Sequence, residues 1–364
     1  MPTVRSWIAL SLIPGLGQES LRRLLGEFGL PERVFEATYA ALCKLVAADV
    51  ARVIADNHQP QGVDRALAWL ERPGNHLLTL ADSEYPPALL QLADPPALLY
   101  VKGRVELLCA PAMLAIVGSR NATPQGLIDA HAFAAALSEA GVTIVSGLAL
   151  GIDAAAHRGA LQGRGSTIAV VGTGLDSVYP ARNRALAHEL AERGALISEF
   201  PLGTPAAAGN FPRRNRLISG LAQGCLVVEA ALSSGSLITA RLAAEQGREV
   251  FALPGSIHSP LAKGSHRLIK QGAKLVESAE DIMEEFKWAA AEQPDSSAAG
   301  DPPPPQLNAL LGCLGAAPTG IDALIERSGL PAQKVVAILL QLELEGEVAA
   351  LPGARYQRIF ARPR

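Results

Sequence analysis

The feature that most constrains the fold is an alternation of short apolar runs with Ala/Leu-rich helical segments between residues 98 and 276. The runs of β-branched or aliphatic residues span 98–101, 114–117, 142–146, 167–172, 196–199, 225–229, 249–253 and 274–276. Strands that are buried on both faces read as continuous apolar runs, and regular strand–helix alternation is typical of a parallel sheet covered by helices. The sequence therefore predicts an α/β fold with an extended, Rossmann-like, mostly parallel sheet.

The composition around this core predicts four segments. Residues 1–80 show helical periodicity and little else, residues 81–288 form the Rossmann-like core, and residues 289–305 form a Pro/Ala-rich linker. Residues 306–364 carry three helical segments and a Gly-centred hairpin, which resembles a winged helix.

Both flanking segments leave their roles open. Ile13-Pro14-Gly15-Leu16-Gly17 is similar to the hairpin of SAM-like or helix-hairpin-helix domains, or it is a plain turn between two helices. The helix expected over 331–345 offers Gln333 and Lys334 near its start but Glu343 and Glu345 at its end. Acidic residues disfavour insertion of this helix into a DNA groove. Contact with a protein, or a simple covering role, is therefore as good an interpretation of the helix as DNA binding.

Composition excludes several classes of protein. Of 364 residues, 49% are hydrophobic and 18% charged, which is too apolar for a disordered chain. No apolar stretch is long enough to span a membrane, and the start lacks an export signal, so we expect a cytoplasmic protein. The four cysteines lie far apart and the seven histidines are scattered, so we expect no metal and no cofactor.

Charge is distributed unevenly along the chain. The segment 110–275 contains 15 basic and 10 acidic residues, whereas the segments on either side are net acidic and the whole chain carries −3. A locally basic region indicates an anionic partner that approaches from one side, or it merely balances its neighbours.

Three loops at the expected carboxyl ends of strands are rich in Gly, Ser and Thr and run into helices. They are Gly118-Ser119-Arg120, the loop from Ser146-Gly147 to Gly151, and Gly172-Thr173-Gly174. Such loops point free N–H groups and the positive end of a helix at an anion, so together they predict one phosphate-binding cleft. The usual dinucleotide and P-loop fingerprints are incomplete or missing, which argues against NAD or ATP chemistry.

The densest cluster of charge is the run Arg213-Arg214-Asn215-Arg216, which follows Phe211-Pro212 and precedes an apolar helix face. Cations at the positive end of a helix are unfavourable unless an anion is bound, so the run predicts phosphate contacts shared with Arg120. Phe211, together with Phe200 and Tyr179, is the candidate for stacking on a base, although burial in the core is the alternative for each.

Six motifs together resemble the DNA-processing protein A (DprA/Smf) family. They are Gly118-Ser119-Arg120, Ser146-Gly147-x-Ala149-x-Gly151-Ile152-Asp153, Ser198-Glu199-Phe200-Pro201, Phe211-Pro212-x-Arg214-Asn215-Arg216-x-Ile218-x-Gly220, Val228-Glu229-Ala230 with Ser234 to Ala240, and Val250-Phe251-Ala252-x-Pro254-Gly255. They extend over about 140 residues in the order of the family, and the flanking segments are similar to the three-part layout of its longer members.

The resemblance implies a non-catalytic protein that binds single-stranded DNA and loads the RecA recombinase onto it in natural transformation. It also implies that Arg120 and the Arg214-Asn215-Arg216 signature contact DNA, and that the chain forms a homodimer through the end of the core that carries His266, Leu268, Ile269 and Leu275. One departure is that Pro205 to Gly209, just before the signature, offers no basic side chain.

Two rival functions remain. A phosphoribohydrolase-like, nucleotide-processing enzyme would use the same cleft with Glu229 as general base, whereas a structural Glu229 would cap the 234–239 loop or hold an arginine. In the other alternative, an adaptor would bind proteins through its terminal domains while the core is inert.

Overall fold

The computed structural model describes residues 2–57, 60–288, 310–314, 318–351 and 353–359. Its centre is a sheet in the strand order β1-β2-β6-β5-β4-β3-β7-β8-β9. The strands are β1 (Asn75–Thr79), β2 (Leu98–Gly103), β3 (Met113–Val117), β4 (Thr143–Ser146), β5 (Thr167–Val170), β6 (Ala195–Ser198), β7 (Gly224–Val227), β8 (Glu249–Ala252) and β9 (Lys274–Leu275).

Each of the eight predicted strands is present, and neighbours from β6 through β9 pair in parallel. Pairing is antiparallel at the other end, where β2 pairs with both β1 and β6. The mostly parallel α/β fold is therefore confirmed. The expectation of helices alone in the first eighty residues was wrong, because β1 is a short edge strand that begins with Asn75-His76 and depends on its pairing with β2.

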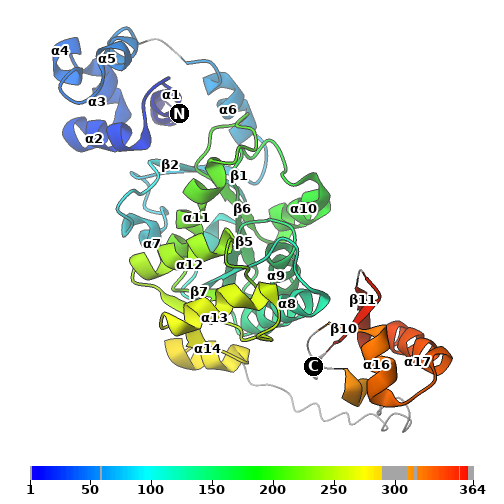
Figure 1. Cartoon of the computed structure of the whole chain (residues 1–364). Helices are drawn as coiled ribbons and strands as arrows, with labels where there is room; N and C mark the ends of the chain where they lie inside the picture. Colours follow the sequence, from blue (N-terminus) through cyan, green and yellow to red (C-terminus); the bar gives the residue numbers. More distant parts are fainter. Residues whose placement is uncertain (1, 58–59, 289–309, 315–317, 352, 360–364) are drawn as a thin grey trace.

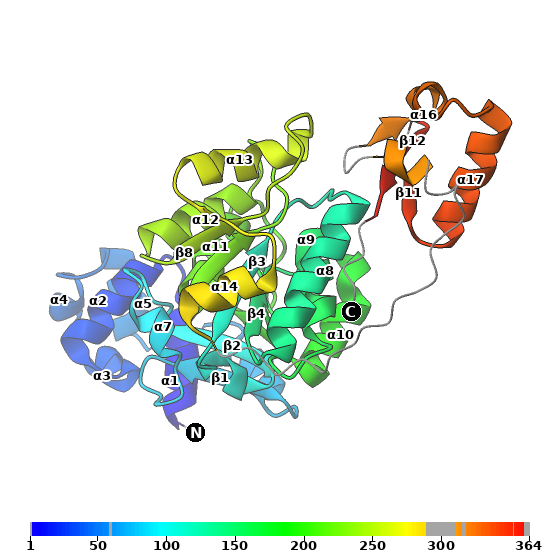
Figure 2. The same ribbon diagram turned by 90° about the horizontal axis from the view of Figure 1, so that it is seen from below.

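Helices cover both faces of the sheet, as Figures 1 and 2 show. In the core they are α7 (Pro87–Leu90), α8 (Pro124–Glu139), α9 (Ile152–Ala160), α10 (Arg184–Arg193), α11 (Asn210–Leu221), α12 (Ser236–Glu245), α13 (Lys263–Lys270) and α14 (Ala279–Phe286). Leu217 and Ile218 of α11 pack on one face, in a cluster with Val117. Phe133 of α8 packs on the other face, in a cluster with Ile116.

The order of the strands reverses at β3. From β3 the chain proceeds through β4 to β6 in one direction, whereas β7 pairs on the other side of β3 and continues to β9. In an open parallel sheet, ligands bind outside the carboxyl ends of the strands at such a reversal. The topology therefore places a candidate site beside the ends of β3, β4 and β7.

The N-terminal helices are α1 (Pro2–Ser11), α2 (Gln18–Phe28), α3 (Pro31–Glu36), α4 (Tyr39–Leu42), α5 (Ala48–Ala55) and α6 (Val63–Leu70). Leu10, Leu21 and Ile54, from α1, α2 and α5, lie in one cluster. Trp69 of α6 lies instead in a cluster with Tyr100 of β2, so α6 packs on the sheet. The hairpin between α1 and α2 turns at Gly15, whose φ of +80° favours glycine.

The C-terminal segment contains α16 (Ile321–Ser328), α17 (Ala332–Leu344) and the strands β10 (Thr319–Gly320), β11 (Val348–Leu351) and β12 (Arg355–Arg358). Its sheet has the order β10-β12-β11, and Leu324, Val335 and Leu339 lie in its core. The two later helices and the hairpin agree with the prediction. The expected linker, 289–305, lies outside the described residues, as do residues 306–309 of a third expected helix, 306–314, whose residues 310–313 are helical. In the part of the chain that the structure describes, no helix is both long and apolar enough to cross a bilayer.

Candidate nucleic-acid interface

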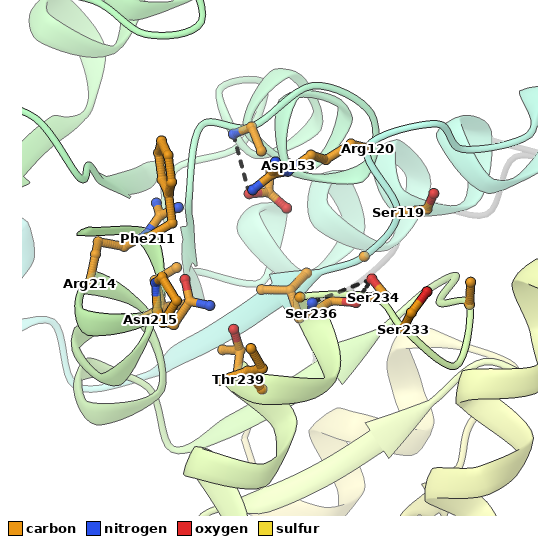
Figure 3. A pocket seen from close by; sticks show the side chains of 18 of the residues that line it. Ser119, Arg120, Asp153, Phe211, Arg214, Asn215, Ser233, Ser234, Ser236 and Thr239 are labelled. Carbon is orange, nitrogen blue, oxygen red and sulfur yellow. Dashed lines mark hydrogen bonds between the residues drawn. The ribbon is translucent and has the colours of Figure 1, made fainter. Parts of the chain in front are cut away.

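A cleft with a volume of about 710 Å³ opens at the carboxyl ends of β3, β4 and β7, where the topology predicts a site (Figure 3). Its walls come from the loop after β3, the start of α9, the N-terminal half of α11, and the loop that leads from β7 into α12. The polar residues among those lining it are Ser119, Arg120, Asn121, Asp153, Tyr179, Arg214, Asn215, Ser233, Ser234, Ser236 and Thr239.

The Gly118-Ser119-Arg120 loop lies at the cleft, as the sequence predicts. The Ser119 amide donates a 2.7 Å hydrogen bond to the Glu229 carbonyl, which ties the loop to the end of β7. A Cβ at Gly118 would lie 2.6 Å from the Ile152 side chain, so the close approach of loop and helix requires glycine. Arg120 is exposed, and its guanidinium lies 5.6 Å from the centre of the Phe211 ring. This leaves the Arg120 charge available at the rim of the cleft.

The second predicted loop shapes the cleft but offers an anion less than expected. The amides of Gly147 and Ala149 donate to a carboxylate oxygen of Asp153, at 3.1 and 3.3 Å, and the Ser146 hydroxyl donates to the Ile116 carbonyl. Gly151 has a φ of +79° and packs directly on the Ser119 carbonyl. The prediction of free N–H donors at Ser146, Gly147 and Gly151 was therefore wrong for Gly147, whose amide Asp153 engages.

Asp153 is itself buried at the base of the cleft. Burial raises the pKa of its carboxyl, an effect that the Arg214 guanidinium and the two loop amides oppose.

The third predicted loop, Gly172-Thr173-Gly174, does not line the cleft. A Cβ at Gly172 would lie 3.1 Å from the Phe211 ring, and the Asn210 amide nitrogen donates to the Gly172 carbonyl at 3.0 Å. Phe211 thus separates this loop from the cleft.

The three arginines of α11 have three different environments. Arg214 lines the cleft but is 4% exposed, and it donates to the carbonyls of Gly147, at 2.6 Å, and Val170. Burial lowers the pKa of Arg214 to about 10. By joining α11 to the ends of β4 and β5, Arg214 positions the wall of the cleft.

Arg216 is paired with carboxylates away from the cleft. Its guanidinium forms an ion pair with Glu199 and a second one with Asp94, at 3.1 Å, and it donates to the Asp94 carbonyl at 2.9 Å. The side chain of Glu199 is only 1% exposed. The prediction that Arg216 contacts phosphate is therefore wrong in this structure, because the helix turns its side chain toward a buried acid.

Arg213 points in another direction. It is exposed and its guanidinium lies 5.3 Å from the centre of the Phe200 ring. It does not belong to the lining of the cleft. Sequence alone indicates three adjacent charges, but successive helix positions differ by about 100° and so face different neighbours.

Phe211 and Asn215 lie in the cleft, as predicted. The centre of the Phe211 ring is 5.7 Å from the centre of the Tyr179 ring, and Tyr179 is half exposed. The two rings therefore form an aromatic pair at the edge of the cleft. Phe200 is 5% exposed and has its alternative role, burial in the core.

One wall of the cleft, made by the loop after β7, was not predicted from the sequence. Ser233, Ser234, Ser236 and Thr239 line the cleft from this loop and the first turn of α12. The signal was present, since a Ser/Gly-rich loop follows a strand and opens a helix, as at the other three loops. In the sequence this loop entered only as part of a family motif and as a possible partner of Glu229.

Glu229 has neither of its expected structural roles. Its carboxylate accepts hydrogen bonds from the Thr123 amide, at 2.9 Å, and from the Thr123 hydroxyl, at 2.6 Å. It thus supports the N-terminus of α8, and the 234–239 loop is not its partner. Burial raises the pKa of Glu229, and its side chain does not line the cleft.

The residues expected at a dimer interface lie at the far end of the sheet. Leu275 on the edge strand β9 is 45% exposed, whereas Leu268 packs partly against the core. His266 and Ile269 are half-buried on α13, and a ring nitrogen of His266 is 2.9 Å from the Gly255 carbonyl. Among the described residues, no cluster of acidic, His or Cys side chains is arranged to hold a metal.

Comparison with known proteins finds related sequences and structures. A model of the DNA recombination-mediator protein A family matches residues 76–287, and a model of the DprA winged helix domain matches residues 293–354. Protein Smf of Escherichia coli (strain K12) is 49% identical over 301 residues, which cover 80% of this chain and 80% of that protein.

Two solved structures extend the likeness. DNA processing protein A from Streptococcus pneumoniae is 36% identical, with a TM-score of 0.69, over 77% of this chain and 97% of that one. DNA processing protein A from Helicobacter pylori, in a structure concerned with the single-stranded DNA binding mode of that protein, is 32% identical, with a TM-score of 0.54, over 58% of this chain and 96% of that one.

Proposed function

This chain belongs to the DNA recombination-mediator protein A (DprA/Smf) family, and from that premise we propose that it is a non-catalytic, single-stranded DNA-binding recombination mediator. In this proposal it loads the RecA recombinase onto incoming single strands in natural transformation. The cleft at the ends of β3, β4 and β7 receives the strand.

The observation that carries the proposal is the pairing of Arg120 with Phe211 at the rim of the cleft. An exposed guanidinium lies over an aromatic ring, with Tyr179 beside that ring. Proteins that bind single strands without sequence preference combine cations for the phosphates with aromatic faces on which bases stack. The relative from Helicobacter pylori, whose structure concerns binding of single-stranded DNA, supports the same reading.

The few charges in the cleft predict that electrostatic attraction contributes modestly to the affinity for DNA. Of the two arginines in its lining, Arg120 is exposed and Arg214 is buried and bonded to carbonyls. The segment 205–209 before α11 adds no basic side chain. Affinity then depends on stacking and on hydroxyl and amide donors as well as on phosphate charge.

A non-catalytic role agrees with the position of Glu229. A general base must reach the proton that it removes, within hydrogen-bonding distance or through one water. The carboxylate of Glu229 is instead engaged by Thr123, outside the lining of the cleft. No observation in the cleft favours the nucleotide-processing enzyme over the binding protein.

Fluorescence-anisotropy titrations with labelled single- and double-stranded oligonucleotides test the proposal. We expect preference for the single strand, and we expect Arg120→Ala to weaken binding of all sequences alike, by about 1 kcal/mol or roughly fivefold. Loss of one phosphate contact also flattens the dependence of log affinity on log salt by about 0.7. The matched control is Arg158→Ala, which removes an exposed arginine of α9 that does not line the cleft. Equal binding by wild type and Arg120→Ala would refute this assignment of the cleft.

RecA and a second copy of this chain are proposed partners on the strength of the family. For the homodimer, the edge strand β9 and exposed Leu275 offer an unpaired border. Sedimentation velocity at tens of micromolar protein, compared between wild type and Leu275→Glu, tests it. If the wild type sediments as a monomer, the proposed dimer is refuted. If Leu275→Glu sediments as a dimer like the wild type, the interface does not lie at β9.

A further inference from the structure

The loop between β4 and α9 has the backbone of an anion-binding loop. Leu148 has a φ of +59°, although it is not glycine, and it is 1% exposed. The amides on either side of it, those of Gly147 and Ala149, converge on a single point. Amides that converge in this way just before a helix form a concavity that suits a phosphate. A residue other than glycine keeps a left-handed conformation only where the surrounding structure requires it.

The surrounding residues fix the orientation of this loop. The side-chain amide of Asn183, which is 3% exposed, donates to the Leu148 carbonyl at 2.9 Å and to the Ala149 carbonyl at 3.2 Å. The amide of Ile152, the first residue of α9, donates to the Ser119 carbonyl at 3.2 Å. The peptide units are therefore held in place, and the two converging amides define the anion position of the loop.

The group at that position belongs to the protein itself. One carboxyl oxygen of Asp153 accepts from both amides, at 3.1 and 3.3 Å. Asp153 is 7% exposed and belongs to the lining of the cleft, where Figure 3 shows it. A Cβ at Gly147 would lie 2.5 Å from a guanidinium nitrogen of Arg214 and 2.7 Å from the same Asp153 oxygen. While the Asp153 side chain is in place, a phosphate cannot reach the two amides.

We propose that Asp153 is a specificity-determining residue of the cleft, whose carboxyl group occupies the anion position of the 146–151 loop and so keeps phosphate out of the floor. The phosphates of a bound strand are then confined to the rim, where Arg120 is exposed. The inference rests on the proposed function only in so far as a strand enters this cleft. If Asp153 merely supports the start of α9, the same hydrogen bonds form, but the loop has no latent capacity for phosphate.

Removing the side chain tests for that capacity. Asp153→Ala leaves two amides without their acceptor and a cavity beside the cleft, so we expect its melting temperature to fall by about 5–10 °C. Inorganic phosphate can then take the vacated position. At about one hundred times its Kd, phosphate should raise the melting temperature of this variant by about 5–10 °C, relative to sodium chloride of equal ionic strength. Wild type should show only the general stabilisation that phosphate gives by exclusion from protein surfaces.

Two variants serve as controls. Asp153→Asn keeps the volume of the side chain and an acceptor oxygen, so phosphate should affect it no more than wild type. Glu199→Ala removes another buried carboxyl, which is bonded to Arg216 and, among the described residues, to no backbone amide. Phosphate should therefore not restore the stability that Glu199→Ala loses.

The salt dependence of strand binding gives a readout that a merely structural role does not move. In Asp153→Ala, a phosphate of a labelled oligothymidylate can enter the vacated position beside the Arg214 guanidinium. Log affinity should then fall with log salt more steeply than for wild type, by about 0.7, whereas Asp153→Asn should keep the wild-type slope. If the alanine variant does not fold, the wild type still decides, because inorganic phosphate should leave the NMR resonances of the Gly147 and Ala149 amides unchanged.

Three results would overturn the inference. They are a loss of stability in Asp153→Ala that phosphate restores no better than in Glu199→Ala, equal salt slopes for Asp153→Ala and wild type when both bind the strand, and movement of the wild-type Gly147 and Ala149 resonances at millimolar phosphate. Failure of the proposed function looks different. In that case wild type does not bind the strand, whereas phosphate still restores the stability of Asp153→Ala.

Discussion

Arg216→Ala separates a structural arginine from a DNA-binding one. In the structure Arg216 is 12% exposed and pairs with Glu199, whose side chain is 1% exposed, and with Asp94, which is half exposed. Removing the guanidinium leaves the Glu199 carboxylate buried without its counter-charge. We therefore expect a loss of stability rather than a specific loss of DNA affinity.

The magnitude follows from the burial of this pair. Breaking a buried ion pair by removing one partner costs about 3–5 kcal/mol, because the remaining charge has lost its solvation. The exposed partner Asp94 adds little, since ion pairs in solvent contribute about 0–1 kcal/mol. We expect Arg216→Ala to lower the free energy of unfolding by about 3 kcal/mol. Arg213→Ala, at the exposed neighbour that contacts Phe200, is expected to cost less than about 1 kcal/mol.

The effect depends on pH with a definite sign. Burial raises the pKa of Glu199 above its ordinary value of 4.5, and Arg216 opposes that rise. Without Arg216 the pKa is higher still, so the native state binds the proton more tightly than the unfolded chain. Stability of the variant then falls as the pH rises through the range above 4.5 and recovers on acidification toward it.

Urea denaturation of the purified variants, followed by circular dichroism at several pH values, measures these differences. Glu199→Gln in the Arg216→Ala background removes the unpaired charge and is expected to restore part of the loss. The reasoning is refuted if Arg216→Ala unfolds like wild type yet binds single strands weakly with a flatter salt dependence. That pattern would return Arg216 to the phosphate-binding role that the sequence predicts.

Two further predictions concern the scaffold of the cleft. Gly151→Ala places a Cβ 2.2 Å from the Ser119 carbonyl oxygen at a φ of +79°. We therefore expect the free energy of unfolding, measured by chemical denaturation, to fall by at least about 2 kcal/mol. Gly209→Ala, where a Cβ meets open space, is the control, and equal stability of the two variants would contradict the close packing of Gly151 on Ser119. Burial lowers the pKa of His157 to about 3, so the unfolded chain gains a proton near pH 6.5 that the native state excludes, and stability decreases below that pH by about 1.4 kcal/mol per unit. NMR titration of the His157 ring should show it neutral at about pH 5, and a midpoint near 6.5 would contradict this.

The parallel sheet could be predicted because its signal is local. Segments such as 114–117 and 225–228 are apolar throughout, and burial on both faces requires that pattern. The short edge strand β1 has no such signal, since only its pairing with β2 makes Asn75–Thr79 extended. The ends of strands also indicated where a cleft would form, and Gly118 to Arg120, Phe211 and Asn215 are found there.

The hydrogen-bond and ion-pair partners of individual polar side chains could not be predicted, because those partners lie far away in the sequence. Arg214 donates to Gly147, 67 positions away, and Arg216 to Asp94, 122 positions away. The amides of the second loop are engaged by Asp153, a residue that the motif contains but whose orientation depends on the fold. Residue type and spacing identify the anion-binding region, whereas the tertiary structure assigns each donor to a ligand or to the protein.

This division of the arginines bears on how a single strand is held. The segment 110–275 has five more basic than acidic residues, yet among the described residues Arg120 is the only basic residue that both lines the cleft and is exposed. One phosphate contact gives a salt slope of about −0.7, and one cation with one aromatic edge supplies limited affinity. If the chain pairs through β9 as proposed, two clefts engage one strand, and the second contact becomes intramolecular at a high effective concentration. A monomeric variant should then lose affinity by much more than half and show about half the salt slope of the dimer.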